Sequence, residues 1–357
     1  MEIPMVRTTF VGACALDFQR PRRTAILAFG VAVFAVATAT SSYAAMQITG
    51  AGSTFDFPFF SRAFYEYSRK NPDVTIDYQP IGSGGGIERF IAKTVDFGAT
   101  DVPMNVQELS RAPGEVLQIP VTLGGVGIAY NLPEIQKGLK LTREVVADIY
   151  LGKITKWNDG AIAKLNPGVK LTDMPITVVH RFDESGTTYI FTEFLSNFSP
   201  EWKQKVGTGK SVQWPISVGG KGNEGVAGLV QETSGAIGYV ELAYLLENEM
   251  PYALLQNKAG KYLYPSIDTV AAAAATKPVS DTDFSIVDTD CDECYPISGY
   301  SWVILYKKPA DPQRGKLLNQ IMNWLVTEGQ AVAKTVHHAL LPENVKKQAQ
   351  QVLSQMQ

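Results

Sequence analysis

Histidine and cysteine are scarce in this chain of 357 residues, which has three of each. Catalytic sites with two metal ions draw on several histidines and carboxylates, so three histidines argue against a bimetal hydrolase centre. Cys14 lies in the N-terminal segment, which leaves Cys291 and Cys294 as a single pair. Two thiolates do not complete a structural zinc site. We therefore expect no metal ion and no cofactor.

Charge is also sparse. Charged residues make up 19% of the chain, the formal net charge is −3, and hydrophobic residues account for 45%. This is the composition of an ordinary globular protein. Without a basic excess, nucleic acid is not an expected partner. The length exceeds that of one ordinary hydrophobic core and indicates two lobes.

The first 44 residues have the pattern of a secretory signal. A stretch with three arginines precedes the apolar run "TAILAFGVAVFAVATAT", and small residues follow it. Ser42 and Ala44 fit the −3 and −1 positions, so we predict a signal peptide over 1–44 and an exported mature protein. An uncleaved membrane anchor is the alternative, although the run is short for a membrane span.

The predicted export affects which oxidation state we expect for Cys291 and Cys294. In an oxidising compartment the Cys-x-x-Cys pair of "DTDCDECYP" predicts a small loop closed by a disulfide between Cys291 and Cys294. A redox-active site is the alternative, but no thioredoxin-like context surrounds the pair.

Strand-like and helical segments alternate along the rest of the chain. "VTIDYQPI", "ITVVHR" and "SWVILYK" are strand-like, whereas "IERFIAKTV", "TTYIFTEFLSNF" and "RGKLLNQIMNWLV" have helical apolar spacing. This alternation predicts an α/β fold with mostly parallel sheets. We expect residues 45–122 and 253–357 to form one lobe and residues 123–252 the other, with strands crossing between them near residues 122 and 252.

Three turns rich in glycine and hydroxyl groups each stand just before a helical run. They are Gly52-Ser53-Thr54-Phe55, Gly82-Ser83-Gly84-Gly85 and Ser185-Gly186-Thr187-Thr188. The first turn of a helix has unpaired N–H groups and the positive end of the helix dipole. One such turn is an ordinary helix cap, but three favour an oxyanion site. A fourth turn, in residues 219–230, lacks hydroxyls, and we interpret it as structural or peripheral.

Two further side chains refine this hypothesis. Arg181 supplies a planar cation suited to tetrahedral oxyanions, and Asp183 either orients it or interacts with the helix dipole. Asp101, in "FGATDVPM", repels an anion unless a proton lies between them. Phosphate has such a proton at neutral pH and sulfate has none, so an acceptor-only group favours phosphate. Without the three turns, Asp101 would be interpreted as an ordinary turn residue at the end of a strand.

The chain resembles a known family, the PstS-type periplasmic phosphate-binding proteins. These are receptors of the bacterial high-affinity phosphate ABC transporter. The resemblance extends from about residue 47 to 305 and is carried, in order, by "ITGAGSTFDFP", "IGSGGGI", "FGATDVPM", "GKITKWND", "RFDESGTT", "GKGNEGVAGLV", "GAIGYVE" and "YPISGYSWVIL". It implies a two-lobed periplasmic substrate-binding fold of type II. Phosphate would lie in the cleft between the lobes.

The resemblance also implies a set of phosphate contacts: Thr54, Phe55 through its backbone N–H, Ser83, Asp101, Arg181, Ser185, Gly186 and Thr187. Asp183 would support Arg181 from behind. The closed form, which we expect to be monomeric, would dock on membrane permease subunits without breaking a bond, so the protein would not be an enzyme. Phe182 and Glu184 depart from the family pattern, and Glu184 adds a negative charge near the cleft.

Other functions fit parts of the sequence. A secreted phosphohydrolase with Ser185 or Ser83 as nucleophile would need an activating base or metals. "VGTGKS" resembles part of a nucleotide-binding loop, but Gln204 replaces the first glycine of that motif. A receptor for another protonated oxyanion, such as arsenate, and an added adhesion or scaffold role stay open.

Overall fold

The computed structural model describes residues 45–136 and 138–357. The predicted signal peptide therefore lies outside the described residues. In chain order the elements up to the middle of the chain are β1 (Met46–Gly52), α1 (Phe57–Lys70), β2 (Val74–Pro80), α2 (Ser83–Ile91), β3 (Phe97–Thr100), α3 (Val106–Arg111), β4 (Val116–Tyr130), β5 (Lys140–Leu141), α4 (Arg143–Tyr150), α5 (Gly160–Leu165) and β6 (Thr177–Arg181).

The second half of the chain continues the alternation of helices and strands. Its elements are α6 (Gly186–Phe198), α7 (Pro200–Lys205), β7 (Val218–Gly220), α8 (Gly222–Glu232), β8 (Ala236–Glu241), α9 (Leu242–Glu247), β9 (Leu254–Gln256), β10 (Tyr262–Leu263), α10 (Ile267–Ala275), β11 (Ser298–Tyr306), α11 (Pro312–Val326), the 3-10 helix η1 (Glu328–Val336) and α12 (Glu343–Leu353).

One eight-stranded sheet, in the order β2-β1-β3-β11-β4-β8-β6-β7, runs through both lobes. β1 pairs in parallel with β2 and β3 at one end, and β6 pairs in parallel with β7 and β8 at the other. In the middle, β11 pairs antiparallel with β3 and β4, and β4 pairs antiparallel with β8. The expectation of mostly parallel sheets therefore holds only at the two ends.

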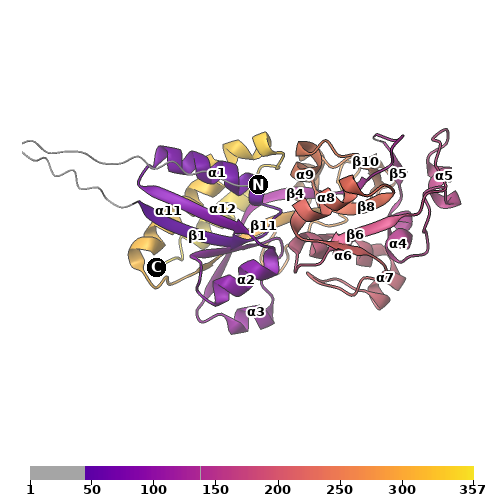
Figure 1. The fold of residues 1–357 in the computed structure, drawn as a ribbon. Coiled ribbons are helices and arrows are strands. Elements are labelled where there is room, and N and C mark those ends of the chain that lie inside the picture. The colour runs from indigo at the N-terminus through magenta and orange to yellow at the C-terminus, as the bar shows by residue number, and fades with distance from the viewer. Residues whose placement is uncertain (1–44, 137) are drawn as a thin grey trace, which may run out of the picture. The chain divides into compact units, whose positions relative to one another are not determined.

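β4 joins the two lobes. Its first part, from Val116, pairs with β11, and its last residues, from Val126, pair with β8. The sequence "VLQIPVTLGGVGIAY" is apolar almost throughout, as expected for a strand covered on both faces, and nearly all of it is buried. Figure 1 shows β4 and β11 between the group of helices around α1 and the group around α8.

The lobe boundary predicted at residue 253 falls beside a second, three-stranded sheet of order β10-β9-β5. β9 pairs in parallel with β5, and Leu255 packs in the same apolar cluster as Ile128 and Ile297. β11 begins directly after Ile297. The predicted limits of the lobes stay a prediction.

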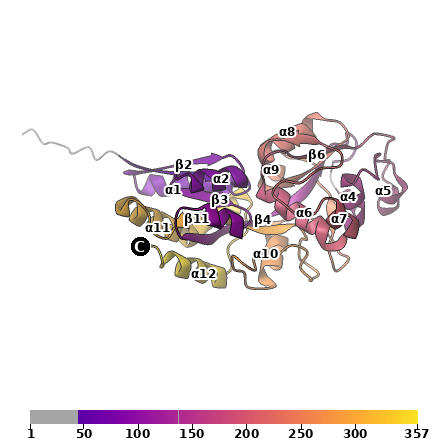
Figure 2. The same ribbon diagram turned by 90° about the horizontal axis from the view of Figure 1, so that it is seen from below.

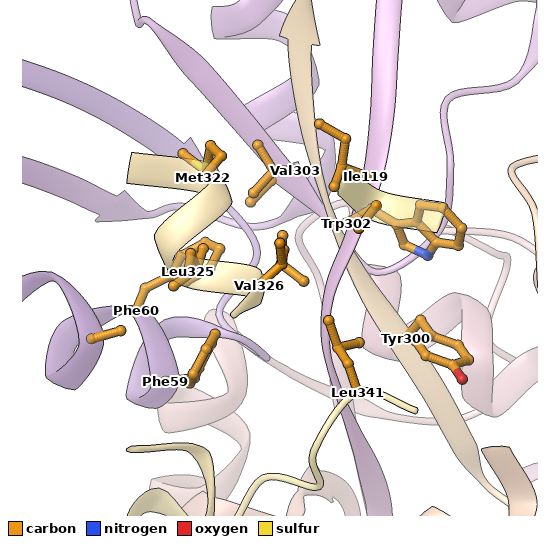
Figure 3. Packing of buried hydrophobic residues seen from close by; sticks show 14 of the residues in the cluster. Phe59, Phe60, Ile119, Tyr300, Trp302, Val303, Met322, Leu325, Val326 and Leu341 are labelled. Carbon is orange, nitrogen blue, oxygen red and sulfur yellow. The ribbon is translucent and has the colours of Figure 1, made fainter. Parts of the chain in front are cut away.

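Each lobe has its own hydrophobic core. In the first, one buried cluster includes Phe59 and Phe60 of α1, Leu325 of α11, and Ile119 and Val303 of the central strands (Figure 3). Figure 2 places α11 and α12 in this lobe, with α6 and α7 in the other. The second core is aromatic. In it the rings of Phe191 in α6 and Tyr239 in β8 stack with centroids 4.4 Å apart. Burial of one such side chain stabilises the fold by about 1.5–3 kcal/mol.

Cys291 and Cys294 are joined by a disulfide, as predicted. The side-chain amide of Asn257 lies against this loop and donates to the main-chain oxygens of Cys291 and Asp292, both at 3.0 Å. The loop is thereby attached to the segment that follows β9. Within residues 45–136 and 138–357, no helix combines the length and apolar content that a membrane crossing requires.

Leu325→Ala should lower the free energy of unfolding by about 2–5 kcal/mol, because it removes a fully buried side chain and leaves a cavity. Urea unfolding followed by circular dichroism measures the change. Val106→Ala is the control, since Val106 is 82% exposed, and should stay within about 0.5 kcal/mol of the wild type. Equal losses in both variants would contradict the assignment of this core.

Candidate anion-binding site

The N-termini of α1, α2, α6 and α8 meet at one place between the lobes. Gly186 N at the start of α6 donates to Ser83 Oγ at the start of α2, at 3.1 Å. Asn223 N in α8 donates to Thr54 Oγ1, just ahead of α1, at 3.2 Å. Each helix end brings N–H groups without intrahelical partners and a positive partial charge. The arrangement can therefore bind an anion.

Arg181, the last residue of β6, supplies the positive charge at this site. Its side chain is 1% exposed and forms an ion pair with Asp183, with Nε 2.7 Å from Asp183 Oδ1. Burial lowers the pKa of Arg181, but Asp183 more than compensates, so the pKa lies above its ordinary value. Asp183 also accepts from Gly222 N at 3.1 Å. It thus holds Arg181 and the start of α8 together, and the contact between Arg181 and Asp183 is the one expected from the sequence.

Asp101 follows β3 and is buried opposite Arg181. Its Oδ1 accepts from Ser53 Oγ at 2.5 Å and from Ser301 Oγ at 2.8 Å. Its Oδ2 has one long contact, 3.4 Å from Ser83 Oγ. Burial raises the pKa of Asp101 to about 6, against the opposing hydrogen bonds of Ser53 and Ser301 and the charge of Arg181. Oδ1 is therefore occupied, and Oδ2 is the oxygen left for a ligand.

Three hydroxyl groups around Arg181 act only as acceptors. Thr54 Oγ1 accepts from Asn223 N and Nδ2 at 3.2 and 2.9 Å. Thr187 Oγ1 accepts from Asn223 Nδ2 at 3.2 Å and from Arg181 Nη1 at 3.4 Å. Ser185 Oγ caps α6 by accepting a main-chain N–H of that helix. None donates a hydrogen bond to another of the residues that the structure describes, so each retains a proton to offer to an anion.

The structure brings the sequence-predicted site residues into this one region. Two of the main-chain donors already have partners, because Phe55 N donates to Ser53 Oγ at 2.9 Å and Gly186 N donates to Ser83 Oγ at 3.1 Å. Glu184, whose place was open, has an exposed side chain, and its carbonyl oxygen accepts from Gly84 N of the other lobe at 3.0 Å. Most of the predicted residues have a hydrogen bond or ion pair to another residue of this region: Thr54, Ser83, Asp101, Arg181, Asp183, Gly186 and Thr187.

The turn in residues 219–230, interpreted from the sequence as structural or peripheral, is not peripheral, because it adjoins the first and third turns. Asn223, fully buried in the first turn of α8, bonds to both Thr54 and Thr187, and its Oδ1 accepts from Glu241 N at 3.0 Å. Residues 219–230 have no hydroxyl side chain, so they lack the pattern of the other three turns. An asparagine amide, however, both donates and accepts, and it follows glycines at a helix start just as the hydroxyls do.

Sequence reasoning also missed Ser53 and Ser301. Ser53 lies beside Thr54 in one of the three predicted turns, but nothing in the sequence indicates that its hydroxyl donates to Asp101. Ser301 is a polar residue inside the apolar strand β11, where a buried hydroxyl must find a hydrogen-bond partner. That mismatch was the signal available in the sequence.

Three comparisons place the chain among known proteins. Residues 37–328 match the family model described as a PBP superfamily domain. The chain is 46% identical over 307 residues to the phosphate-binding protein PstS of Xylella fastidiosa, covering 85% of this chain and 84% of that protein. It is 43% identical over 328 residues to the protein of the same name from Pasteurella multocida, covering 91% and 93%.

A solved structure agrees at the level of the fold. The phosphate binding protein from Stenotrophomonas maltophilia superposes with a TM-score of 0.64 at 18% identity, covering 86% of this chain and 94% of that one. The chain is therefore a two-lobed substrate-binding protein of the PBP superfamily, and the predicted fold class is confirmed. Within that superfamily, its identity to the curated relatives shows that it belongs to the PstS phosphate-binding protein family.

Gly186→Ala should keep the two lobes apart. A Cβ at Gly186 would lie 2.5 Å from Asp101 Oδ2 and 2.7 Å from Ser83 Oγ, closer than atoms pack. The radius of gyration measured by small-angle X-ray scattering should therefore exceed that of the wild type. Gly228→Ala is the control, because its Cβ meets nothing within 4 Å and should leave the radius unchanged. A Gly186→Ala protein as compact as the wild type would contradict the close approach.

Proposed function

We propose that this chain is a periplasmic receptor that binds inorganic phosphate and delivers it to the permease of a phosphate ABC transporter. The observation that carries the proposal is Asp101, a buried carboxylate placed among groups that otherwise attract anions. One of its oxygens accepts hydrogen bonds from two hydroxyl groups, and the other has a single contact, 3.4 Å from Ser83 Oγ. The relatives from Xylella fastidiosa and Pasteurella multocida, both named phosphate-binding proteins, support the same ligand.

The proposed contacts divide into charge, donors and one acceptor. Arg181 neutralises charge on the phosphate, while the hydroxyls of Thr54, Ser185 and Thr187 donate to its oxygens. The first turns of α2 and α6, at Ser83, Gly186 and Thr187, supply further donors, and Phe55 contributes its backbone N–H after exchanging Ser53 for the ligand. Asn223 positions Thr54 and Thr187 rather than contacting the phosphate.

The proposed selectivity for phosphate over sulfate follows from the Asp101 carboxylate, which can only accept hydrogen bonds. Above about pH 6 the Asp101 carboxylate is ionised and can only accept, so it pairs with a proton that the anion brings. Sulfate brings none and would face a buried negative charge. Arsenate, which is protonated like phosphate, passes the same test and stays an alternative ligand.

Ligand capture would bridge the lobes. Gly84 N to Glu184 O and the Lys210–Glu108 ion pair already connect the two sides, and a bound anion would add contacts to both. A ligand that contacts both lobes favours the closed state. We propose that the closed, monomeric receptor docks on the permease, that residues 1–44 are removed on export, and that no bond is broken, since Ser185 serves as a cap and donor rather than a nucleophile.

Calorimetric titration tests the ligand. The wild-type protein with residues 1–44 removed should bind phosphate tightly and sulfate at least about 100-fold more weakly, because a buried unpaired charge costs several kcal/mol. Asp101→Asn should narrow this gap, since an amide can donate to sulfate. Asp77→Asn, an exposed aspartate in β2, is the control and should change neither affinity. Tight sulfate binding by the wild type would overturn the proposal.

The gap between the two anions should also depend on pH. The pKa of Asp101 is about 6, so below that pH the carboxyl takes a proton of its own and can donate it to sulfate. The ratio of sulfate to phosphate affinity should therefore rise as the pH is lowered from 8 to 5. The same titrations on Asp101→Asn should show a flat ratio. A wild-type ratio that does not change across this range would contradict the role of Asp101.

A further inference from the structure

Asp56 occupies the N-cap position of α1 but does not cap the helix. Its side chain accepts no hydrogen bond from the first turn, and the residue is fully buried. Instead, Oδ2 lies 2.7 Å from Ser301 Oγ and Oδ1 lies 3.1 Å from Tyr78 Oη. An aspartate that leaves a favoured capping role for the interior calls for another explanation.

The protons available around Asp56 are few. Tyr78 Oη has one proton and two oxygen neighbours, Ser53 O at 2.8 Å and Asp56 Oδ1 at 3.1 Å. A carbonyl oxygen can only accept, so the tyrosine proton belongs to the shorter contact with Ser53 O. Tyr78 therefore gives Asp56 little stabilisation as an anion.

Ser301 also has fewer protons than possible acceptors. Its single proton lies between Asp56 Oδ2 at 2.7 Å and Asp101 Oδ1 at 2.8 Å. If both carboxyls were ionised, one hydroxyl would separate two buried negative charges and could donate to one of them. If Asp56 has a proton, it donates to Ser301 Oγ, and Ser301 donates to Asp101. The second arrangement satisfies both short contacts.

The groups packed around Asp56 do not offer a compensating charge. Tyr78 faces it from β2, Ser301 from β11 and Asp101 from the end of β3, and Tyr244 approaches from α9. No ion pair among the described residues involves Asp56, and Arg181 is paired with Asp183. Burial first, and then the charge of Asp101, raise the pKa of Asp56 well above its ordinary value.

Two more titratable groups lie beyond this shell. His338 Nε2 contacts the main-chain oxygen of Phe55 at 3.1 Å, and Glu241 Oε1 lies 3.9 Å from that nitrogen. Among the described residues, no hydrogen bond or ion pair joins either side chain to Asp56. Burial also raises the pKa of Glu241 well above its ordinary value, so Glu241 is a second candidate for a protonated carboxyl and must be separated from Asp56 in any test.

We propose that Asp56 is a neutral carboxylic acid whose proton is donated to Ser301 Oγ, which fixes Ser301 as a donor to Asp101 and keeps Asp101 as the ionised acceptor of the ligand's proton. Asp56 and Ser301 are then positioning residues that determine specificity without touching the anion. The inference rests on the proposed function for its consequence, but the protonation of Asp56 itself concerns the ligand-free protein. Two neighbouring carboxyls are thereby assigned opposite protonation states.

Difference infrared spectroscopy tests the proton directly. At pH 8, without ligand, the wild type should show carbonyl stretching bands of protonated carboxylic acids, and Asp56→Asn should lack one of them. Glu241→Gln separates the other candidate and should retain the Asp56 band, while Asp77→Asn should leave the spectrum unchanged. Should Asp56→Asn not fold, Glu241→Gln decides: a remaining protonated band supports the proposal. Loss of every such band in Glu241→Gln, or an unchanged spectrum in Asp56→Asn, overturns it.

Anion titrations between pH 5 and 8 test the consequence. Asp56→Asn keeps a neutral donor to Ser301, so its phosphate affinity and the pH at which sulfate discrimination weakens should match the wild type within about threefold. Ser301→Ala removes a donor from Asp101, which should raise that pH and weaken phosphate binding by about tenfold or more. An Asp56→Asn protein that loses discrimination as Asp101→Asn does would overturn the proposal. Failure of the wild type to bind phosphate would refute the proposed function alone, since the infrared result stands without ligand.

Discussion

The buried carboxylate of Asp101 is the constraint on which the rest of the site depends. A buried ionised group needs several donors, and Asp101 takes them from three distant parts of the chain: Ser53, Ser83 and Ser301. These residues belong to or adjoin β1, α2 and β11. The strand order β1-β3-β11 brings them to the same end of the sheet, so the topology of the first lobe and the chemistry of the site are one arrangement.

The register of β11 shows how closely the strand is adapted to this task. Its pairing with β4 shifts between Ser301 and Trp302, where the partners change from Thr122 to Pro120. Proline cannot donate to the ladder, and irregularities of this kind re-aim neighbouring side chains. Ser301 consequently points its hydroxyl at two carboxyls, while Trp302 stays in the hydrophobic core.

An acidic protein can hold an anion here because the attraction is local. Asp183 offsets part of the charge of Arg181, and the helix N-termini add their positive potential to what remains. This also explains why two buried aspartates beside the site cannot both be ionised. A second full negative charge would cancel much of what the helix ends contribute.

The limits of prediction follow from the same physics. Turns such as Ser185-Gly186-Thr187 were recognisable because helix starts have a local sequence signature, and Arg181 and Asp183 lie two residues apart, within reach of each other. Asn223 was missed because its role depends on partners at residues 54 and 187. The antiparallel centre of the sheet was missed because pairing between distant strands leaves no local pattern.

Asp56 is the residue whose role is hardest to predict from the sequence. Its position before a helix matches the signature of a cap, and in the sequence nothing distinguishes it from one. The difference appears only when the oxygens around it are counted together with the protons that they can share. In the mechanism that we propose, specificity for a protonated anion depends on the ionised Asp101 and also on a second carboxyl that stays neutral behind it. In such a site the placement of protons is as much a part of the fold as the placement of side chains.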